Sequence, residues 1–163
     1  MAKRLETAAN VAMIVVAVIA GTVLVRNLMT RSKSRPMPPP IAAGTPLAVP
    51  GVDWRENGKT LVLAVSTACH FCSESAPFYR SLAAEVARKH VHMTALLPQA
   101  VPEGRQYLSG LEVPIDDVRQ ASLKSLKLRG TPTLLLVDDR GLVRRVWEGK
   151  LSPDAERQVI GAL

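Results

Sequence analysis

The two cysteines of this chain lie three positions apart, directly after a short apolar run and directly before a stretch with helical periodicity. The apolar run, 61–65, is continuous, which is typical of a strand that is buried on both faces of a sheet. The stretch 74–89 repeats apolar residues every three to four positions, which predicts an amphipathic helix. Cys69 and Cys72 must therefore lie where a buried strand passes into a helix.

The spacing of this cysteine pair suits redox chemistry. Two intervening residues in the first turn of a helix bring the two sulfurs within disulfide reach. Free N–H groups and the helix dipole favour an anion at a helix N-terminus, so Cys69 is the expected thiolate nucleophile. Cys72, one turn later, is placed to attack a mixed disulfide and release the substrate. The pair predicts thiol–disulfide exchange with proteins, which needs no organic cofactor and no metal; a purely structural pair is the alternative.

The rest of 51–163 alternates between strand and helix patterns. Apolar runs and a turn signal predict three further strands, at 91–97, 134–137 and 142–147. Periodicity and capping residues predict three further helices, at 104–111, at 119–126 and from Ser152 onward. This order of elements predicts an α/β sandwich with a mixed sheet.

The net charge of the chain is +7, from 21 Lys and Arg against 14 Asp and Glu, and by itself this excess suggests a nucleic acid or an anionic membrane as partner. Only 4% of the residues are aromatic, which is too few for a base-stacking surface. The first 35 residues carry +5 of the charge, and 36–163 carry +2. The excess therefore belongs to the N-terminal segment, and no nucleic-acid partner is expected.

From Thr7 to Val25, a run of 19 residues contains no charged side chain. As a helix this run would be about 28 Å long, close to the hydrocarbon thickness of a bilayer. It predicts a single-pass transmembrane helix, with 1–35 as the membrane anchor and its flanks. A signal peptide cleaved after Ala20 is the alternative, although the apolar run continues past that point.

Proline dominates the segment that follows the predicted anchor. Six of the twelve prolines fall in 36–50, which predicts an extended tether that holds a single domain, 51–163, away from the membrane. More Lys and Arg follow the apolar run than precede it, so the positive-inside rule favours a cytoplasmic domain.

Several motifs together resemble the thioredoxin superfamily. They are the strand, the Cys-x-x-Cys pair and the helix, with Pro77 five residues after the second cysteine, and the sequence 130–133, Gly-Thr-Pro-Thr, before an apolar strand and hairpin. The resemblance implies a thioredoxin-like three-layer sandwich with a mixed central sheet. It also implies that Pro132 is cis and faces the cysteines, and that Thr131 and Pro132 bind the substrate chain.

The anchor, the tether and the extra segment around 98–112 are similar to the TlpA-type branch of that superfamily. Members of this branch are tethered outside the cytoplasm and reduce disulfides. The resemblance implies a membrane-tethered thiol–disulfide oxidoreductase with its domain on the periplasmic side. It also implies protein thiols and disulfides as substrates and a redox partner in the membrane. We therefore expect the domain on the periplasmic side despite the positive-inside rule, because long domains translocate largely regardless of flanking charge.

The chain departs from the family pattern around its cysteines. Leu63 stands where thioredoxin has a buried Asp, and Ser75 stands where anchored relatives often carry Glu. Glu74, one position earlier, is the remaining candidate for a proton acceptor. His70 and Phe71 separate the cysteines, and an imidazolium at His70 would stabilise the first thiolate and make the pair more oxidising. We expect His70, Phe71 and Glu74 to modulate the site.

Two functions other than exchange use the same residues. A metallochaperone for zinc or copper would combine the cysteine pair with His90 and His92, although the His-x-His spacing is unlike that of a zinc finger. A membrane-tethered adaptor with an inactive thioredoxin-like fold would use no redox chemistry.

Overall fold

The computed structural model describes residues 13–23, 25–26 and 41–163, which fall in two units. In the first unit, 13–23 form a helix with exposed apolar side chains, and 25–26 are helical as well. The other residues of the predicted anchor lie outside the described residues. Within the described part of the chain, no helix combines the length and the apolar character that crossing a membrane requires.

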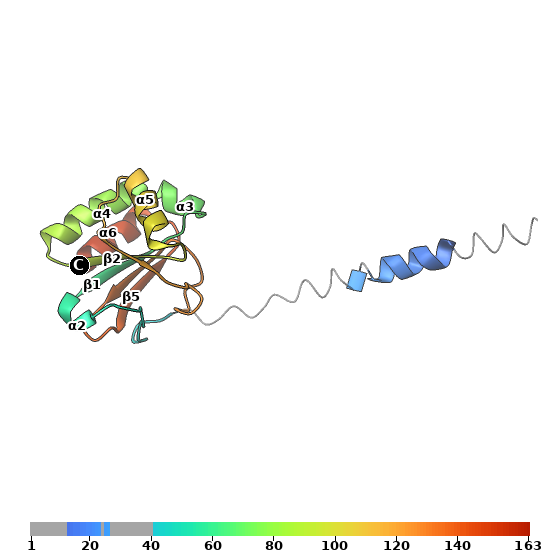
Figure 1. The fold of residues 1–163 in the computed structure, drawn as a ribbon, viewed down its shortest axis with the longest axis horizontal. Coiled ribbons are helices and arrows are strands. Elements are labelled where there is room, and N and C mark those ends of the chain that lie inside the picture. Colours follow the sequence, from blue (N-terminus) through green and yellow to red (C-terminus); the bar gives the residue numbers. More distant parts are fainter. Residues whose placement is uncertain (1–12, 24, 27–40) are drawn as a thin grey trace, which may run out of the picture. The chain divides into compact units, whose positions relative to one another are not determined.

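The second unit is built on one mixed sheet (Figure 1). The sheet has five strands, in the order β3-β2-β1-β4-β5. Its strands are β1 (Thr60–Ala64), β2 (His92–Leu97), β3 (Asp117–Gln120), β4 (Thr133–Val137) and β5 (Val143–Glu148). β1, β2 and β3 are parallel, whereas β4 is antiparallel to both β1 and β5. The predicted α/β architecture with a mixed sheet is confirmed, and every residue of the central strands β1 and β4 is buried.

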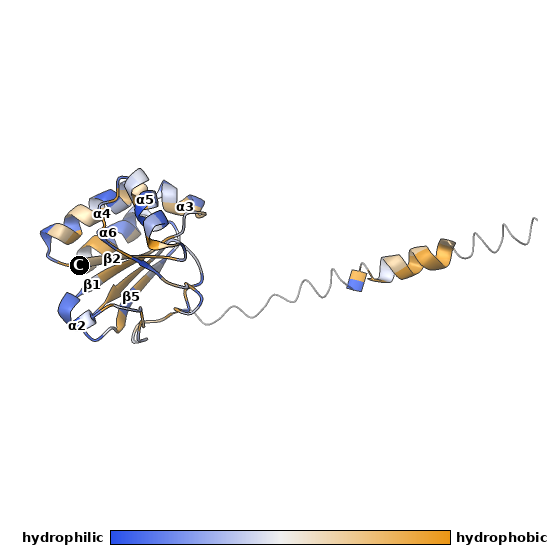
Figure 2. Cartoon of the chain, in the orientation of Figure 1, coloured by the Kyte–Doolittle hydropathy of each residue, from blue (hydrophilic) through white to orange (hydrophobic). Residues whose placement is uncertain are grey.

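Helices and loops cover the two faces of this sheet. The helices are α2 (Trp54–Asn57), α3 (His70–Glu74), α4 (Ala76–Arg88), α5 (Val101–Gly110) and α6 (Pro153–Ala162). Side chains alternate along β1, so that Leu61 and Leu63 join a first core with residues of α4 and α6. Val62 and Ala64 join a second core on the other face, formed with loop segments. The strands are correspondingly hydrophobic, whereas the helices are of mixed hydropathy (Figure 2).

The strand directions bring several loops to one end of the sheet. Because β1, β2 and β3 are parallel, their carboxyl ends lie side by side. The antiparallel pairing of Ala64 with Thr133 brings the start of β4 to the same place. We call this the carboxyl end of the sheet. The cysteine pair, the Thr131–Pro132 loop and the segments after β2 and β3 all lie there.

The predicted tether, 36–50, differs from the structure where it is described; 36–40 lie outside the described residues. A backbone hydrogen bond of 2.7 Å joins Gly44 to Val143, so this segment runs beside β5. Three of its side chains are buried in the second core: Ile41, Leu47 and Val49. Burial of these apolar side chains favours packing over the extended conformation that the prolines predict.

The helix predicted over 119–126 is wrong. Residues 117–120 form β3, and 123–127 form turns. Val118 is buried and pairs with Ala95 of β2, so its packing on the sheet outweighs local helix propensity. A strand of four residues is too short to show a clear alternating pattern in the sequence.

A polar cluster around Asp117 joins β2, β3 and the segment near Gly51. The Thr94 hydroxyl donates to the Asp117 carboxylate at 2.7 Å, and His92 Nε2 lies 3.1 Å from the same oxygen. Arg119 donates to the other carboxylate oxygen at 2.8 Å and to the Gly51 carbonyl at 2.6 Å. Burial alone would raise the pKa of Asp117, but the hydrogen bonds of its neighbours and the charge of Arg119 hold this pKa below its usual value.

We expect Asp117→Asn to lower the free energy of unfolding by about 1–2 kcal/mol at pH 7, since hydrogen bonds to a charged group are lost. A depressed folded-state pKa contributes stability above the unfolded value of about 3.9, and this contribution disappears as the pH falls through the folded-state pKa. The difference from wild type should therefore shrink in acid. Urea unfolding of the full chain from pH 3 to 7 measures it. The matched control is Asp116→Asn at the exposed neighbour; an equal loss in both variants would contradict the role of the cluster.

Candidate active site

The cysteine pair begins the first helix after β1. Cys69 is the N-cap of α3, and Cys72 lies within that helix, with its side chain fully buried. The two residues are joined by a disulfide, with their Cα atoms 5.3 Å apart. The Cys72 backbone N–H donates to Cys69 Sγ at 3.2 Å, which is the contact that would stabilise a thiolate there. Cys69 is only half-buried, so it is the sulfur that a partner can reach.

The loop before β4 lies against this sulfur. The Thr131–Pro132 peptide bond is cis, as the family resemblance implies. The Thr131 carbonyl oxygen lies 3.3 Å from Cys69 Sγ, which brings the two segments together across 62 positions of sequence. The Gly149 N–H donates to the Pro132 carbonyl at 2.7 Å, and the Thr133 hydroxyl donates to the Gly130 carbonyl at 2.8 Å. The loop is thus held on both sides of the proline.

Glu74 lies on the surface. Its carboxylate accepts a hydrogen bond from Lys150 Nζ at 2.8 Å, and His70 Nε2 lies 2.9 Å from its other oxygen. The hydrogen bond from Lys150 is the main cause that lowers the pKa of Glu74, against a smaller opposing effect of burial. The carboxylate of Glu74 therefore contacts His70 and Lys150 at the surface. Cys72, for which Glu74 was the candidate proton acceptor, is buried. Phe71 is 54% exposed, and its ring centroid lies 5.9 Å from that of His70.

The two positions at which the resemblance to thioredoxins and their anchored relatives implies an acid hold neutral side chains. Leu63 is fully buried in the same core as Cys72. Ser75, also buried, caps the C-terminus of α3 and donates its hydroxyl to the Phe71 carbonyl at 2.8 Å. Tyr79 packs in that core, and burial raises its pKa to about 12, so its hydroxyl stays protonated at neutral pH. None of these three side chains is a carboxylate base for the second thiol.

Sequence reasoning missed a set of contacts from α5 and the segment before it. Gln99 Nε2 donates to the Ser66 hydroxyl at 3.1 Å, just before the cysteine pair. The Thr67 hydroxyl donates to Glu103 at 3.3 Å. Beyond the pair, the hydroxyls of Ser73 and Tyr107 lie 3.2 Å apart. These contacts connect the cysteine segment to α5 and to the segment before it, and no local sequence pattern predicts them.

The metal site considered for the cysteines and two histidines is not assembled. His92 begins β2 beside Thr60, at the opposite end of the sheet from the cysteines, and contacts Asp117. His90 is exposed just after α4. Within the described residues, no group of three or more His, Cys, Asp or Glu side chains could hold a metal ion.

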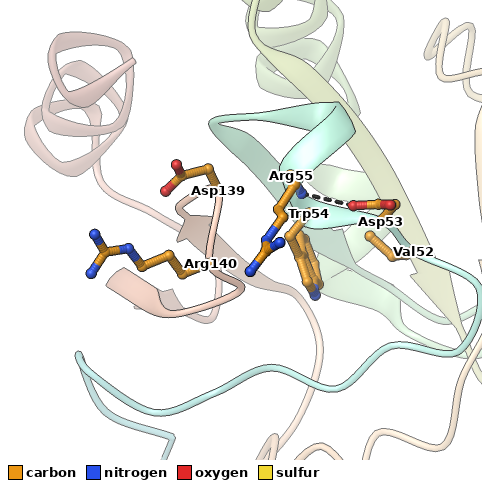
Figure 3. Close-up of a pocket in the computed structure, with 6 residues that line it drawn as sticks. All are labelled: Val52, Asp53, Trp54, Arg55, Asp139 and Arg140. Carbon is orange, nitrogen blue, oxygen red and sulfur yellow. Dashed lines mark hydrogen bonds between the residues drawn. The ribbon is translucent and has the colours of Figure 1, made fainter.

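A separate surface hollow lies near α2 and the β4–β5 turn. Its lining residues are Val52, Asp53, Trp54, Arg55, Asp139 and Arg140 (Figure 3). The Asp53 carboxylate accepts a hydrogen bond from the Arg55 backbone N–H at 2.9 Å, which caps α2. This hollow lies beside the start of β1, away from the carboxyl end of the sheet, and contains no cysteine.

By sequence, neither a protein-family model nor a curated protein matches the chain. By structure, it is similar to a thiol-disulfide isomerase from Corynebacterium glutamicum, with a TM-score of 0.55 at 17% identity, covering 77% of this chain and 94% of that one. A secreted disulfide oxidoreductase from Mycobacterium tuberculosis, homologous to E. coli DsbE, has a TM-score of 0.51 at 16% identity over 66% and 83% of the two chains. The peroxidoxin BcpB from the same organism reaches 0.57 at 14% identity over 75% and 95%.

These similarities show a thioredoxin-like fold that resembles DsbE/TlpA-type thiol–disulfide oxidoreductases in structure, at low identity. The presence of a peroxidoxin among the similar structures shows that this fold supports more than one redox chemistry. The fold alone therefore does not determine the function, which depends on the side chains at the site of this chain.

Proposed function

We propose that this chain is a thiol–disulfide oxidoreductase that exchanges its Cys69–Cys72 dithiol or disulfide with protein substrates. The observation that carries the proposal is the unequal exposure of the two sulfurs next to the Thr131 carbonyl. Cys69 is accessible at the start of α3, whereas Cys72 is buried beneath it. This is the arrangement that a nucleophilic and a resolving thiol require.

In the reductive direction, the Cys69 thiolate attacks one sulfur of a substrate disulfide, forms a mixed disulfide and expels the other sulfur as a thiolate. Cys72, as a thiolate, then attacks Cys69 Sγ. The Cys69–Cys72 bond forms, the mixed disulfide breaks, and the substrate leaves with both sulfurs reduced. Two electrons pass to the substrate, and the oxidative direction is the reverse of these steps.

Thr131 and Pro132 are the proposed substrate-binding residues. The Thr131 carbonyl lies 3.3 Å from the reactive sulfur, so an extended substrate chain that reaches this sulfur passes along the loop. Backbone hydrogen bonds between an extended peptide and a loop of this kind give affinity without fixing the sequence of the peptide. His70 and Phe71 lie between the two cysteines, Glu74 contacts His70, and all three are proposed to modulate the pair.

We also propose that the domain is tethered to a membrane by the N-terminal segment, lies on its extracytoplasmic side and exchanges electrons with a redox partner in that membrane. Support comes from the uncharged run Thr7–Val25, with basic residues at both of its ends. In the described helix 13–23, large apolar side chains such as Ile14, Val16 and Ile19 are exposed. A topology reporter fused after Leu163 tests the orientation.

The exchange proposal predicts that Cys72→Ala traps substrates. Cys69 can still attack a disulfide in this variant, but the resolving thiol is absent, so the mixed disulfide persists. When the reduced full chain of this variant is incubated with scrambled ribonuclease, we expect mixed-disulfide adducts to accumulate. Dithiothreitol should cleave these adducts. Non-reducing electrophoresis and mass spectrometry measure them. Ser73→Ala, a change of the exposed neighbouring residue, is the control and should trap nothing.

An absence of adducts in Cys72→Ala, together with unchanged exchange in Cys69→Ala, would show that the roles are assigned wrongly. An adaptor with an inactive fold would show no turnover of scrambled ribonuclease in the wild-type chain. These two results are separable, because the first concerns the variants and the second concerns the wild-type protein.

A further inference from the structure

A hollow lies at the carboxyl end of the sheet, where the cysteine pair also lies. Its lining residues are Pro98, Gln120, Ala121, Ser122, Leu123 and Lys124. Pro98 follows β2 and Ala121 follows β3, and both strands run parallel to β1, which leads to the cysteines. Gln99, next to Pro98, donates to the Ser66 hydroxyl at 3.1 Å in the loop before the cysteines. The hollow and the reactive sulfur therefore share one end of the molecule.

The loop that follows this hollow in the chain, 124–129, has exposed cationic side chains. Leu126 and Leu128 are buried in the second core, and Lys127 and Arg129, which alternate with them, are exposed. The Leu128 N–H donates to the Leu123 carbonyl at 2.9 Å and closes the turn. The loop is thus fixed by its apolar side chains, and this fixes the positions from which the charged side chains project.

The cations of this loop have no partner in the part of the chain that the structure describes. Lys124, Lys127 and Arg129 make no ion pair and no side-chain hydrogen bond to any residue that the structure describes. Elsewhere in the domain, Arg119 is paired with Asp117 and Lys150 with Glu74, whereas the cations chosen for the control variant below also make no ion pair within the described residues. Three positive charges without a partner among the described residues therefore lie on one loop.

The loop leads directly to the reactive sulfur. Arg129 lies two residues before Thr131, whose carbonyl oxygen is 3.3 Å from Cys69 Sγ. A peptide that reaches this sulfur along the Thr131–Pro132 loop therefore passes close to Arg129. Glu103, which approaches the cysteine segment through Thr67, belongs to α5 on the other face of the sheet.

We propose that the hollow and the three cations bind the segment of a protein substrate that flanks its reactive cysteine, and that this segment is acidic. The inference rests on the proposed function and adds a substrate class to it. Unpaired cations beside a reactive atom raise the local concentration of an anionic partner and orient its approach. Because these cations are exposed, the effect acts mainly on the association rate and weakens as salt screens it.

The test uses the reduced full chain in non-ionic detergent micelles and three synthetic peptides with the same internal disulfide. The disulfide is flanked by three Glu in the first peptide, three Gln in the second and three Lys in the third. Acid quenching and chromatography measure the second-order rate of peptide reduction. At ~20 mM salt we expect the Glu peptide to react about tenfold faster than the Gln peptide, and the Lys peptide to react more slowly than both. At ~500 mM salt the three rates should converge.

A charge-reversal variant identifies the cations responsible. Changing Lys124, Lys127 and Arg129 to Glu should make the Glu peptide the slowest of the three and the Lys peptide the fastest, each rate being taken relative to that of the Gln peptide with the same variant. The matched control changes three exposed cations near the other end of the sheet to Glu: Arg55, Arg140 and Arg145. It carries the same change in net charge and should keep the wild-type order of rates. If the reversal variant does not fold, the corresponding triple Gln variant should abolish the preference.

The outcomes separate this inference from the proposed function. If the wild-type chain reduces none of the three peptides, the proposed function fails. If it reduces all three at equal rates at low salt, or if the control triple loses the preference as well, exchange stands and the acidic-segment inference is overturned. Equal peptide rates, with binding to vesicles of anionic phospholipid that the reversal variant loses, would overturn it in favour of a membrane surface.

Discussion

Replacing Cys69 with serine will reduce disulfide exchange by at least about 1000-fold, because a serine hydroxyl is a far weaker nucleophile than a thiolate at neutral pH. Cys69 is the half-buried N-cap of α3, so the substitution removes the one sulfur of the pair that a substrate can reach. The measurement is the rate at which the reduced full chain reactivates scrambled ribonuclease. Serine is a good N-cap, so α3 itself should be preserved.

The control for this experiment is the variant Cys72→Ser. This variant should lose turnover but keep the first step, so that a stoichiometric burst of mixed disulfide remains. Activity in Cys69→Ser above about one tenth of wild type would contradict the assignment, since a rate loss so small is not expected from removal of a nucleophile. Activity loss only in Cys72→Ser, without a burst, would mean that the roles of the cysteines are reversed.

Introducing the family's buried acid at Leu63 will destabilise this domain by about 3–5 kcal/mol at pH 7. A carboxylate at this position is buried without a cation partner, and an uncompensated buried charge costs about that much. Leu63 has no exposed surface and lies in an apolar core with Val65, Cys72 and Leu82. Urea unfolding of the oxidised full chain measures the loss through the fluorescence of Trp54 and Trp147, which both pack on the domain.

The pH dependence distinguishes a buried charge from a cavity. Burial raises the folded-state pKa of the new carboxyl group above its unfolded value of about 3.9. The loss of stability in Leu63→Asp should therefore be about that of Leu63→Asn in acid, where only the buried leucine side chain is lost, then grow as the pH rises between the two pKa values and level off above them. Leu63→Asn, which has a similar shape without the charge, should show a loss that does not vary with pH. A Leu63→Asp domain as stable as wild type at pH 8 would show that its neighbours can accommodate the charge.

The parts of the site that could be predicted from the sequence are those formed by residues close together in the chain. The apolar run before Cys69, the two-residue spacing to Cys72 and the helix that follows are contiguous, so the strand-to-helix junction could be inferred directly. The cis bond at Pro132 was implied by resemblance and is confirmed. The nearness of Thr131 to the reactive sulfur followed from the same resemblance, not from the residues themselves.

The parts that were not predictable depend on residues distant in sequence. Gln99, Glu103 and Tyr107 contact the cysteine segment across 33 to 36 positions, and no local spacing indicates such pairs. β3 pairs with β2 over only four residues, too few to distinguish a strand from a helix by periodicity. In 41–49, prolines suggested an extended tether, whereas the apolar side chains between them are buried against the sheet.

Because successive side chains of β1 point to opposite faces of the sheet, the two cores of this domain can be altered separately. The buried thiol Cys72 belongs to the first core, while the loop that carries Lys124, Lys127 and Arg129 is anchored in the second through Leu126 and Leu128. Exchanging this loop for one of another charge would repack one face and leave the surroundings of the buried thiol intact. The packing around the buried thiol and the charge of the exposed loop are therefore separable traits, which could be changed one at a time.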